Sequence, residues 1–249
     1  MIKILSIGNS FSQDAQAYLH QIAASAGIES KVVNLYIGGC SLEKHHNNIT
    51  ENAVAYSYEL NGDIHMGRKA SIMEGLCEED WDFVTMQQAS GWSGIPDSYY
   101  PHIIELSDYV KQYAPTAKQV IHQTWAYEQT ASHPHFSKYG SDQKMMYPAV
   151  IASYAGAAEK LGGLPIIRCG ELVQELRSDP IFVPNTGKYL ITRDGYHMNI
   201  PYGRYALAAL WFETLMGGDI YHASFIPEKA DAYIINRIKR YVKKFSKAE

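Results

Sequence analysis

Asp194 and His197 lie three residues apart in the segment R-D-G-Y-H-M-N, and Ser10 lies in I-G-N-S-F at the other end of the chain. A histidine that drives acyl transfer needs a carboxylate to hold its tautomer and a hydroxyl to deprotonate. The spacing lets the Asp194 carboxylate reach the Nδ1–H of His197 while Nε2 faces outward. These residue types indicate a serine esterase in which Ser10 is the nucleophile, His197 the base and Asp194 the group that orients the histidine.

Each segment also has a simpler interpretation. Serine and asparagine are common helix caps, and Ser10 follows the first apolar run directly. The residues D-G-Y-H are equally typical of a polar turn. A serine at a strand-to-helix turn, however, presents its backbone N–H and the positive end of the helix dipole to a charge forming beside its hydroxyl. The catalytic interpretation is preferred because one sheet edge would hold both segments.

The elements that must position these residues follow from hydrophobic periodicity. Strand-like apolar runs occupy 2–7, 32–37, 82–86, 119–124 and 165–168, and helical patterns occupy 14–26, 99–113, 143–161, 172–177, 200–216 and 229–245. This alternation predicts a three-layer α/β/α sandwich of flavodoxin-like type with a five-stranded parallel sheet. We expect a single domain over 1–249, with a small hairpin-like insertion near 50–63 that ends at the turn pair Asn61-Gly62. Ligands of such sheets bind beyond the carboxyl ends of the strands, where 8–10, 38–41 and 87–90 fall.

The chain resembles the SGNH or GDSL hydrolases over nearly its whole length. The first block of that superfamily is a glycine, a polar residue and the nucleophilic serine, which I-G-N-S-F matches, with Asn9 in place of the usual aspartate. The resemblance implies that a glycine after the second strand gives a backbone N–H to an oxyanion hole; Gly39 is preferred here and Gly38 is the alternative. The last block, D-x-x-H, matches residues 194–197.

The third block departs from the superfamily pattern. An asparagine usually completes the oxyanion hole, whereas W-D-F-V-T-M-Q-Q-A-S has Gln87, with Gln88 as the alternative. The resemblance therefore implies an oxyanion hole made by Ser10, Gly39 and Gln87. Glutamine at this place, with H-Q-T-W-A-Y further on, is similar to a branch found in gut-type bacteria and related to carbohydrate esterases. Trp125 and Trp92 are candidate substrate-binding residues, as an acyl-pocket wall or a sugar platform, although each can also be core packing.

Composition excludes several other classes. A chain of 249 residues with 46% hydrophobic content buries a full core, and a net charge of −4 with a pI near 6.2 does not favour nucleic-acid binding. No apolar run is long enough for a membrane span, and Met1 begins a strand-like segment without signal-peptide features. We expect a cytoplasmic protein, or a periplasmic or secreted one if a leader preceded this sequence. Three widely spaced cysteines predict buried free thiols.

Other motifs are not followed by the residues that a cofactor or metal needs. His45-His46 and His133-Pro134-His135 bring no carboxylate at the third or fourth following residue, so we expect surface loop histidines and no metal. The glycine pairs lack the patterns of nucleotide-binding loops, so no cofactor is expected. Ser93 in G-W-S-G-I does not match the nucleophile-elbow pattern.

Together these observations predict a carboxylic ester hydrolase that acts through a serine acyl-enzyme on a small-molecule ester. The resemblance to carbohydrate esterases favours removal of a short acyl group, acetyl, from a sugar. The alternatives are a thioesterase or lysophospholipase, an acyltransferase that uses another sugar in place of water, and a carbohydrate-binding protein without turnover. The motifs do not distinguish these, because a catalytic apparatus fixes the reaction class and not the substrate. They also do not define the oligomeric state.

Overall fold

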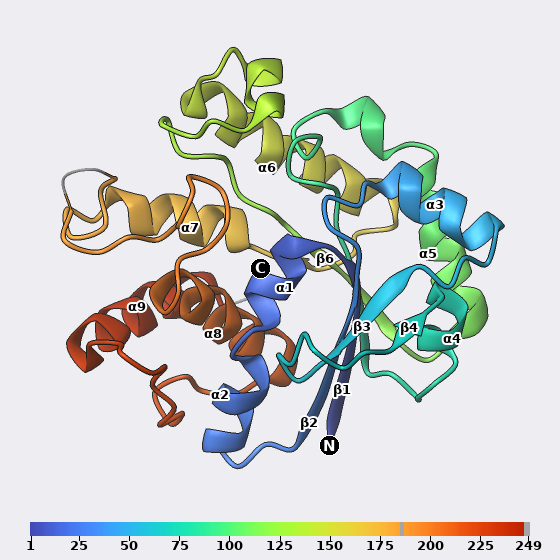
Figure 1. Ribbon diagram of the computed structural model, residues 1–249, viewed down its shortest axis with the longest axis horizontal. Helices are drawn as coiled ribbons and strands as arrows, with labels where there is room; N and C mark the ends of the chain where they lie inside the picture. The colour runs from blue at the N-terminus through green and yellow to red at the C-terminus, as the bar shows by residue number, and fades with distance from the viewer. Residues whose placement is uncertain (185–186, 247–249) are drawn as a thin grey trace.

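A single mixed sheet forms the centre of the computed structural model, which describes residues 1–184 and 187–246 (Figure 1). Seven strands lie in the order β4-β3-β2-β1-β5-β6-β7. The five parallel strands are β1 (Ile2–Gly8), β2 (Ser30–Tyr36), β5 (Phe83–Met86), β6 (Lys118–His122) and β7 (Ile166–Ile167). They correspond to the five predicted runs, so the parallel core of the sheet is confirmed.

The prediction of five strands in all is wrong, because the expected insertion joins the sheet. β3 (Tyr56–Leu60) pairs antiparallel with β2, and β4 (Lys69–Ala70) pairs antiparallel with β3. Tyr56 and Tyr58 are buried, so the alternation that suggested a free hairpin marks a strand with one face on the core. The chain turns at Asn61, whose N–H bonds the Val32 carbonyl of β2 at 2.7 Å.

Helices cover both faces of the sheet, which confirms the three-layer architecture (Figure 1). On one side lie α1 (Ser10–Gln16), α2 (Leu19–Ser25), α8 (Tyr202–Met216) and α9 (Ala232–Phe245), and on the other lie α3 (Leu42–Thr50), α4 (Ile72–Leu76) and α5 (His102–Tyr113). The long α6 (Gln143–Lys160) packs on β7 and on α7 (Cys169–Ser178), and the short η1 (Pro96–Tyr99) and η2 (Pro134–Tyr139) contact α6.

The helix α8, which contacts the helix that begins at Ser10, is buried on nearly all sides. Every residue of α8 from Tyr205 to Phe212 is fully buried, and α8 packs against both α1 and α2. A helix that is hydrophobic all round belongs in a core. The helix predicted over 14–26 is in fact two helices, α1 and α2, and α3 and α4 were not predicted at all.

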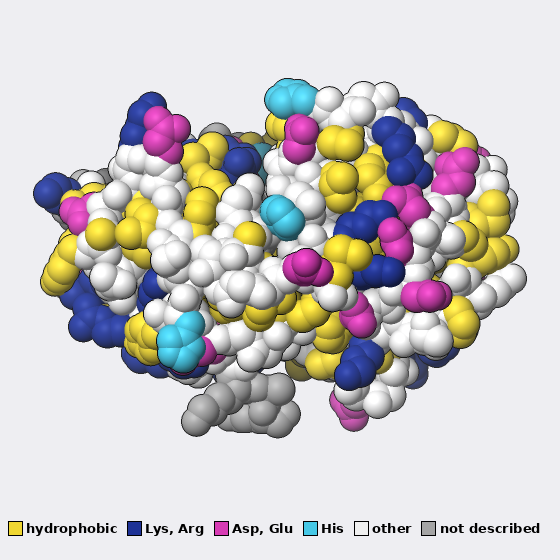
Figure 2. Space-filling model, turned by 90° about the horizontal axis from the view of Figure 1, so that it is seen from below, with side chains coloured by type: hydrophobic (Ala, Val, Ile, Leu, Met, Phe, Trp, Pro, Cys, Tyr) yellow, Lys and Arg dark blue, Asp and Glu magenta, His cyan; other side chains and the backbone are white. Residues whose placement is uncertain are grey.

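Charges of both signs are spread over the end of the molecule where β1 begins (Figure 2). In the described ranges, no helix combines the length and the apolar character that a membrane span requires. The expectation of buried free thiols holds for Cys40 and Cys169, whereas Cys77 is exposed at the end of α4.

Candidate active site

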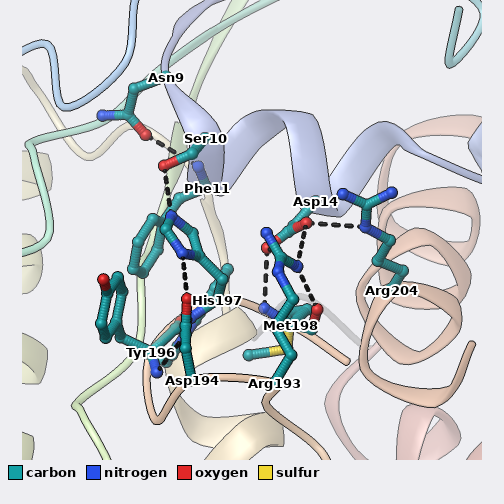
Figure 3. Close-up of polar contacts among 11 residues, drawn as sticks. Asn9, Ser10, Phe11, Asp14, Arg193, Asp194, Tyr196, His197, Met198 and Arg204 are labelled. Atoms are coloured by element: carbon teal, nitrogen blue, oxygen red, sulfur yellow. Dashed lines mark hydrogen bonds and ion pairs between the residues drawn. The ribbon is translucent and has the colours of Figure 1, made fainter. Parts of the chain in front are cut away.

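Ser10, His197 and Asp194 form one hydrogen-bonded chain (Figure 3). His197 Nε2 lies 2.9 Å from Ser10 Oγ, and His197 Nδ1 lies 2.7 Å from Asp194 Oδ2. Because an ionised carboxylate only accepts, Nδ1 carries the proton and Nε2 is left to accept from the serine hydroxyl. The three groups predicted from the sequence therefore meet in the arrangement that a general base requires.

The turn of D-G-Y-H holds the carboxylate in place. Asp194 Oδ1 accepts from the backbone N–H groups of Tyr196 at 3.1 Å and His197 at 2.7 Å. Gly195 has a φ of +89°, and a Cβ there would lie 2.9 Å from the Ala131 Cα, so the turn needs glycine. Burial by itself would raise the Asp194 pKa, but the bonds from His197 and Tyr196 outweigh it and hold that pKa below its ordinary value. Residues 194–197 therefore form both the polar turn and the acid–base pair.

At the start of α1, the helix cap is Asn9 and not Ser10. Asn9 Oδ1 accepts from the Phe11 N–H at 2.9 Å, while Ser12 Oγ accepts from the Asn9 N–H at 3.0 Å. This leaves the Ser10 hydroxyl for His197, and the Ser10 N–H has no acceptor in the part of the chain that the structure describes. Gly8 is needed because a Cβ there would lie 1.9 Å from Ser12 Oγ.

The turn after β2 lies beside this helix start. Asn9 Nδ2 donates to the Cys40 carbonyl at 3.0 Å, which ties the Gly38-Gly39 turn to the serine segment. Gly39 has a φ of +62° and is exposed, as is Gly38. Neither glycine N–H bonds an acceptor among residues 1–184 and 187–246, so both alternatives for the oxyanion donor stay predictions.

Gln87 is held from two sides at the end of β5. Its Nε2 donates to Asn9 Oδ1 at 2.6 Å, and its Oε1 lies 2.5 Å from His122 Nδ1. His122 is fully buried, and burial lowers its pKa to about 3, so the neutral ring donates from Nδ1 and fixes which way the amide faces. One of the two N–H groups of Gln87 Nε2 bonds Asn9, next to Ser10. The other N–H has no acceptor among the described residues.

Gln88 has a different role. Its Oε1 accepts from the Leu42 and Ala89 N–H groups at 3.0 and 2.8 Å, and its Nε2 donates to the Ser98 carbonyl and hydroxyl at 2.8 and 3.1 Å. Both amide hydrogens are engaged, so Gln88 joins the start of α3 to η1. The structure favours Gln87 over Gln88 as the candidate oxyanion donor.

The two candidate tryptophans differ in burial. Trp125 is fully buried, stacks on Phe11 with centroids 4.2 Å apart, and donates from Nε1 to the Tyr196 carbonyl at 2.6 Å. It supports neighbours of both Ser10 and His197, so the expectation of a pocket wall or sugar platform is wrong for Trp125. Trp92 is partly exposed and lines a surface hollow of about 240 Å³.

A buried carboxylate that the sequence analysis missed joins α1 to residues 193–198, the histidine loop (Figure 3). Asp14 is fully buried and accepts from Arg193 Nη1 at 3.1 Å, Arg204 Nε at 2.8 Å and the Met198 N–H at 2.8 Å. Arg193 and Met198 flank the D-x-x-H segment, whereas Asp14 lies one helical turn after Ser10. The sequence could have indicated this role, because Asp14 lies four residues after the candidate serine and so lies on the same side of a helix.

Comparisons with known proteins show the family and the fold of the chain. The model of a family described as a domain of unknown function, DUF4886, matches residues 3–242. The chain belongs to the DUF4886 family. A crystal structure of a DUF4886 family protein from Bacteroides uniformis is 36% identical, with a TM-score of 0.87 over 98% of this chain and 93% of that one. Among curated proteins, none matches.

The DUF4886 fold is also that of the SGNH hydrolases, which confirms the resemblance seen in the motifs. A candidate SGNH hydrolase from Slackia heliotrinireducens is 26% identical, with a TM-score of 0.58 over 87% of this chain and 99% of that one. An acetylxylan esterase from Geobacillus stearothermophilus shares the fold at 13% identity, with a TM-score of 0.53 over 88% and 95% of the two chains. These similarities support a hydrolase of the SGNH type.

Proposed function

We propose that this protein hydrolyses a carboxylic ester through a serine acyl-enzyme. The observation that carries the proposal is the continuous chain from Asp194 through His197 to Ser10, with contacts of 2.7 and 2.9 Å. The serine is 187 residues away from the histidine in sequence, so the contact reflects the tertiary fold and not local turn chemistry.

In the proposed reaction, Ser10 Oγ attacks the ester carbonyl while His197 Nε2 takes its proton. Asp194 keeps the ring in the reactive tautomer and stabilises the imidazolium. The carbonyl oxygen becomes an oxyanion, which the N–H groups of Ser10 and Gly39 and the amide of Gln87 hold. When the oxyanion collapses, the ester C–O bond breaks, His197 gives its proton to the departing alcohol and the acyl group stays on Ser10 Oγ. Water then attacks this acyl-enzyme while His197 takes a proton from it, and the bond from Ser10 Oγ to the acyl group breaks as His197 returns the proton to Ser10 and the acid leaves. The reaction needs no cofactor.

A row of five aromatic rings, which begins at His197, supports an acylated sugar as the substrate. From His197 the row runs through Tyr196, His133 and His135 to Trp92, with successive ring centroids 4.6, 4.9, 5.3 and 5.4 Å apart. All five members are partly exposed. Aromatic rings with a polar edge pack against the C–H faces of a sugar and leave its hydroxyls to bond elsewhere. We therefore propose removal of a short acyl group, acetyl, from a carbohydrate.

The test is hydrolysis of p-nitrophenyl acetate and p-nitrophenyl octanoate by the wild type, Ser10→Ala and His197→Ala. Ser137→Ala and His222→Ala are matched controls, because both residues are exposed and outside the site. We expect turnover of the acetate ester, at least about 10³-fold lower in both site variants and unchanged in the controls. If Ser10→Ala and the wild type were equally active, Ser10 could not be the nucleophile.

The same assay orders the alternatives. Preference for octanoate would favour a lysophospholipase-type hydrolase, and acetylated xylo- or glucosaccharides then distinguish a deacetylase from a general short-chain esterase. A Trp92→Ala variant that raises KM for an acetylated oligosaccharide, but not for p-nitrophenyl acetate, would place the sugar on the aromatic row. Binding of that saccharide without turnover of any ester would instead support a carbohydrate-binding protein.

A further inference from the structure

His46, His102 and Glu105 meet where α3 packs on α5. The three side chains place their ligand atoms within 4.8 Å of one another. His102 and Glu105 lie three residues apart on one face of the first turn of α5, and His46 reaches them from α3. None of the three takes part in the proposed ester chemistry.

The polar atoms of this cluster are not satisfied by one another. The Nδ1 atoms of His46 and His102 are both buried without a hydrogen-bond partner. Glu105 Oε2 is only 2.8 Å from His46 Nδ1, yet the two are not aligned as a hydrogen bond. A buried ring nitrogen without a partner calls for an explanation, and a shared ion is one that accounts for both nitrogens and the carboxylate.

We propose that His46, His102 and Glu105 bind a divalent transition metal ion, with Zn²⁺ as its occupant. Two imidazoles and one carboxylate are a common zinc ligand set that leaves a fourth position for water, and imidazole favours Zn²⁺ over Mg²⁺ or Ca²⁺. Zinc bonds of this type place ligand atoms about 3.3 Å apart around a tetrahedron, so the side chains close inward on binding. They can do so because the His46 and Glu105 side chains are 29% and 45% exposed.

The ion has an approach route and a structural consequence. His102 lines the same surface hollow of about 240 Å³ as Trp92, together with the carboxylate-bearing Glu43. A metal ion with ligands from both α3 and α5 would cross-link the two helices. α3 begins just after the Gly38-Gly39 turn. Zinc would thus hold α3 against α5 and stabilise the fold without contacting Ser10, His197 or Asp194.

The pattern was not recognisable in the sequence, where the absence of a nearby carboxylate argued against a metal. His46 contacts Glu105 of α5, whereas its neighbour His45 contacts Tyr56 of β3. His45 is fully buried in α3, however, and lies 2.8 Å from the Tyr56 hydroxyl, so it is not a surface loop histidine. The carboxylate and the second imidazole come from α5, more than fifty residues further along.

The experiment titrates zinc into the full chain, stripped with a chelator, by isothermal calorimetry, and measures Tm with and without zinc. We expect one equivalent bound with a Kd of about 1 µM or lower. His46→Ala, His102→Ala and Glu105→Gln should each raise that Kd at least about 100-fold, since removal of even an outer partner of a ligand costs 10- to 100-fold. His222→Ala, which removes an exposed histidine 3.9 Å from Asp219, should bind zinc like the wild type.

Thermal unfolding gives an independent arm. At a zinc concentration 100 times Kd, the wild type and His222→Ala should gain roughly 5–10 °C in Tm, and His46→Ala should gain nothing. A Tm of the zinc-free variants close to that of the wild type shows that they fold. The proposal is overturned if the wild type binds no zinc at micromolar concentrations, or if the three ligand variants bind it as the wild type does.

Discussion

Replacement of Asp14 by asparagine tests how the fold holds the histidine loop against the serine helix. The carboxylate is fully buried and accepts from two arginines, Arg193 and Arg204, and from the Met198 N–H. Asparagine keeps the shape of the side chain but loses the charge, and its NH₂ group would face donors where an oxygen now accepts. The link between α1 and the residues that flank D-x-x-H would therefore break while the motif itself stays intact.

The magnitude has two parts. Removing one partner of a buried ion pair costs about 3–5 kcal/mol, and here the figure falls to about 2–4 kcal/mol because water can reach the two arginines. Their side chains are 35% and 21% exposed. A displacement of His197 by about 1 Å relative to Ser10 costs a further factor of about 100 in kcat. KM should change little, since Asp14 contacts no part of the site that would hold the substrate.

Asp179→Asn is the matched control. Asp179 has a side chain that is only 1% exposed, and it accepts from Arg237 Nε and Nη2 at 2.5 and 2.9 Å and from the Tyr241 hydroxyl at 2.9 Å. It joins the end of α7 to α9, away from the loop that carries Asp194 and His197. Its loss should reduce stability to a similar extent and leave kcat unchanged at any temperature where the variant is folded.

The assay combines urea unfolding of both variants with kcat and KM for p-nitrophenyl acetate at 25 °C. Unfolding free energies show that both proteins are folded in the kinetic assay, and only Asp14→Asn should lose kcat. Equal kcat values for Asp14→Asn, Asp179→Asn and wild type would refute the reasoning, because Asp14 would then contribute to stability alone.

Three further outcomes follow from the contacts of Gln87 and from two buried histidines, His45 and His122. Gln87→Asn should lose as much kcat as Gln87→Ala, about 10²–10³-fold, because the shorter side chain cannot span Asn9 and His122; retention of wild-type kcat by Gln87→Asn would contradict this. His122→Phe keeps the ring packing but removes the bond to Gln87, so kcat should fall by about tenfold, and no change would show that the amide is oriented by Asn9 alone. Burial lowers the pKa of both His45 and His122 to about 3, so between roughly pH 6.5 and 3 the unfolded chain binds protons that the folded chain does not. Stability should therefore fall as the pH falls, by up to about 1.4 kcal/mol per pH unit for each histidine, and urea unfolding that gives equal values at pH 7 and 5 would contradict it.

The parallel strands could be predicted because each is a short, mostly apolar run that alternates with helical patterns. β1, β2, β5 and β6 lie within two residues of the expected runs. β3 could not be assigned in this way, since Tyr56, Tyr58 and the polar residues between them alternate in the same manner in an edge strand and in a free hairpin. What decides between the two is the exposed edge of β2, which a single sequence does not show.

The candidate site divides along similar lines. Ser10, Asp194 and His197 lie in short motifs whose residue types carry the chemistry, so their roles could be proposed before any contact was known. Gln87 over Gln88 could not be chosen, because adjacent strand-end side chains face opposite ways and the direction depends on the register of β5. Trp125 could not be separated from a pocket residue either, because residue type does not determine burial.

Positioning groups lie outside motifs for a physical reason. A single hydrogen bond contributes about 1 kcal/mol net, too little to hold a histidine 2.9 Å from a serine that lies 187 residues away. The structure therefore adds supports that contact the neighbours of these residues and not the residues themselves. Asp14 bonds Met198, next to His197, and Trp125 stacks on Phe11 and bonds Tyr196, which flank Ser10 and His197. Any buried group with the right reach can fill such a role, so the fold and not the motif selects it.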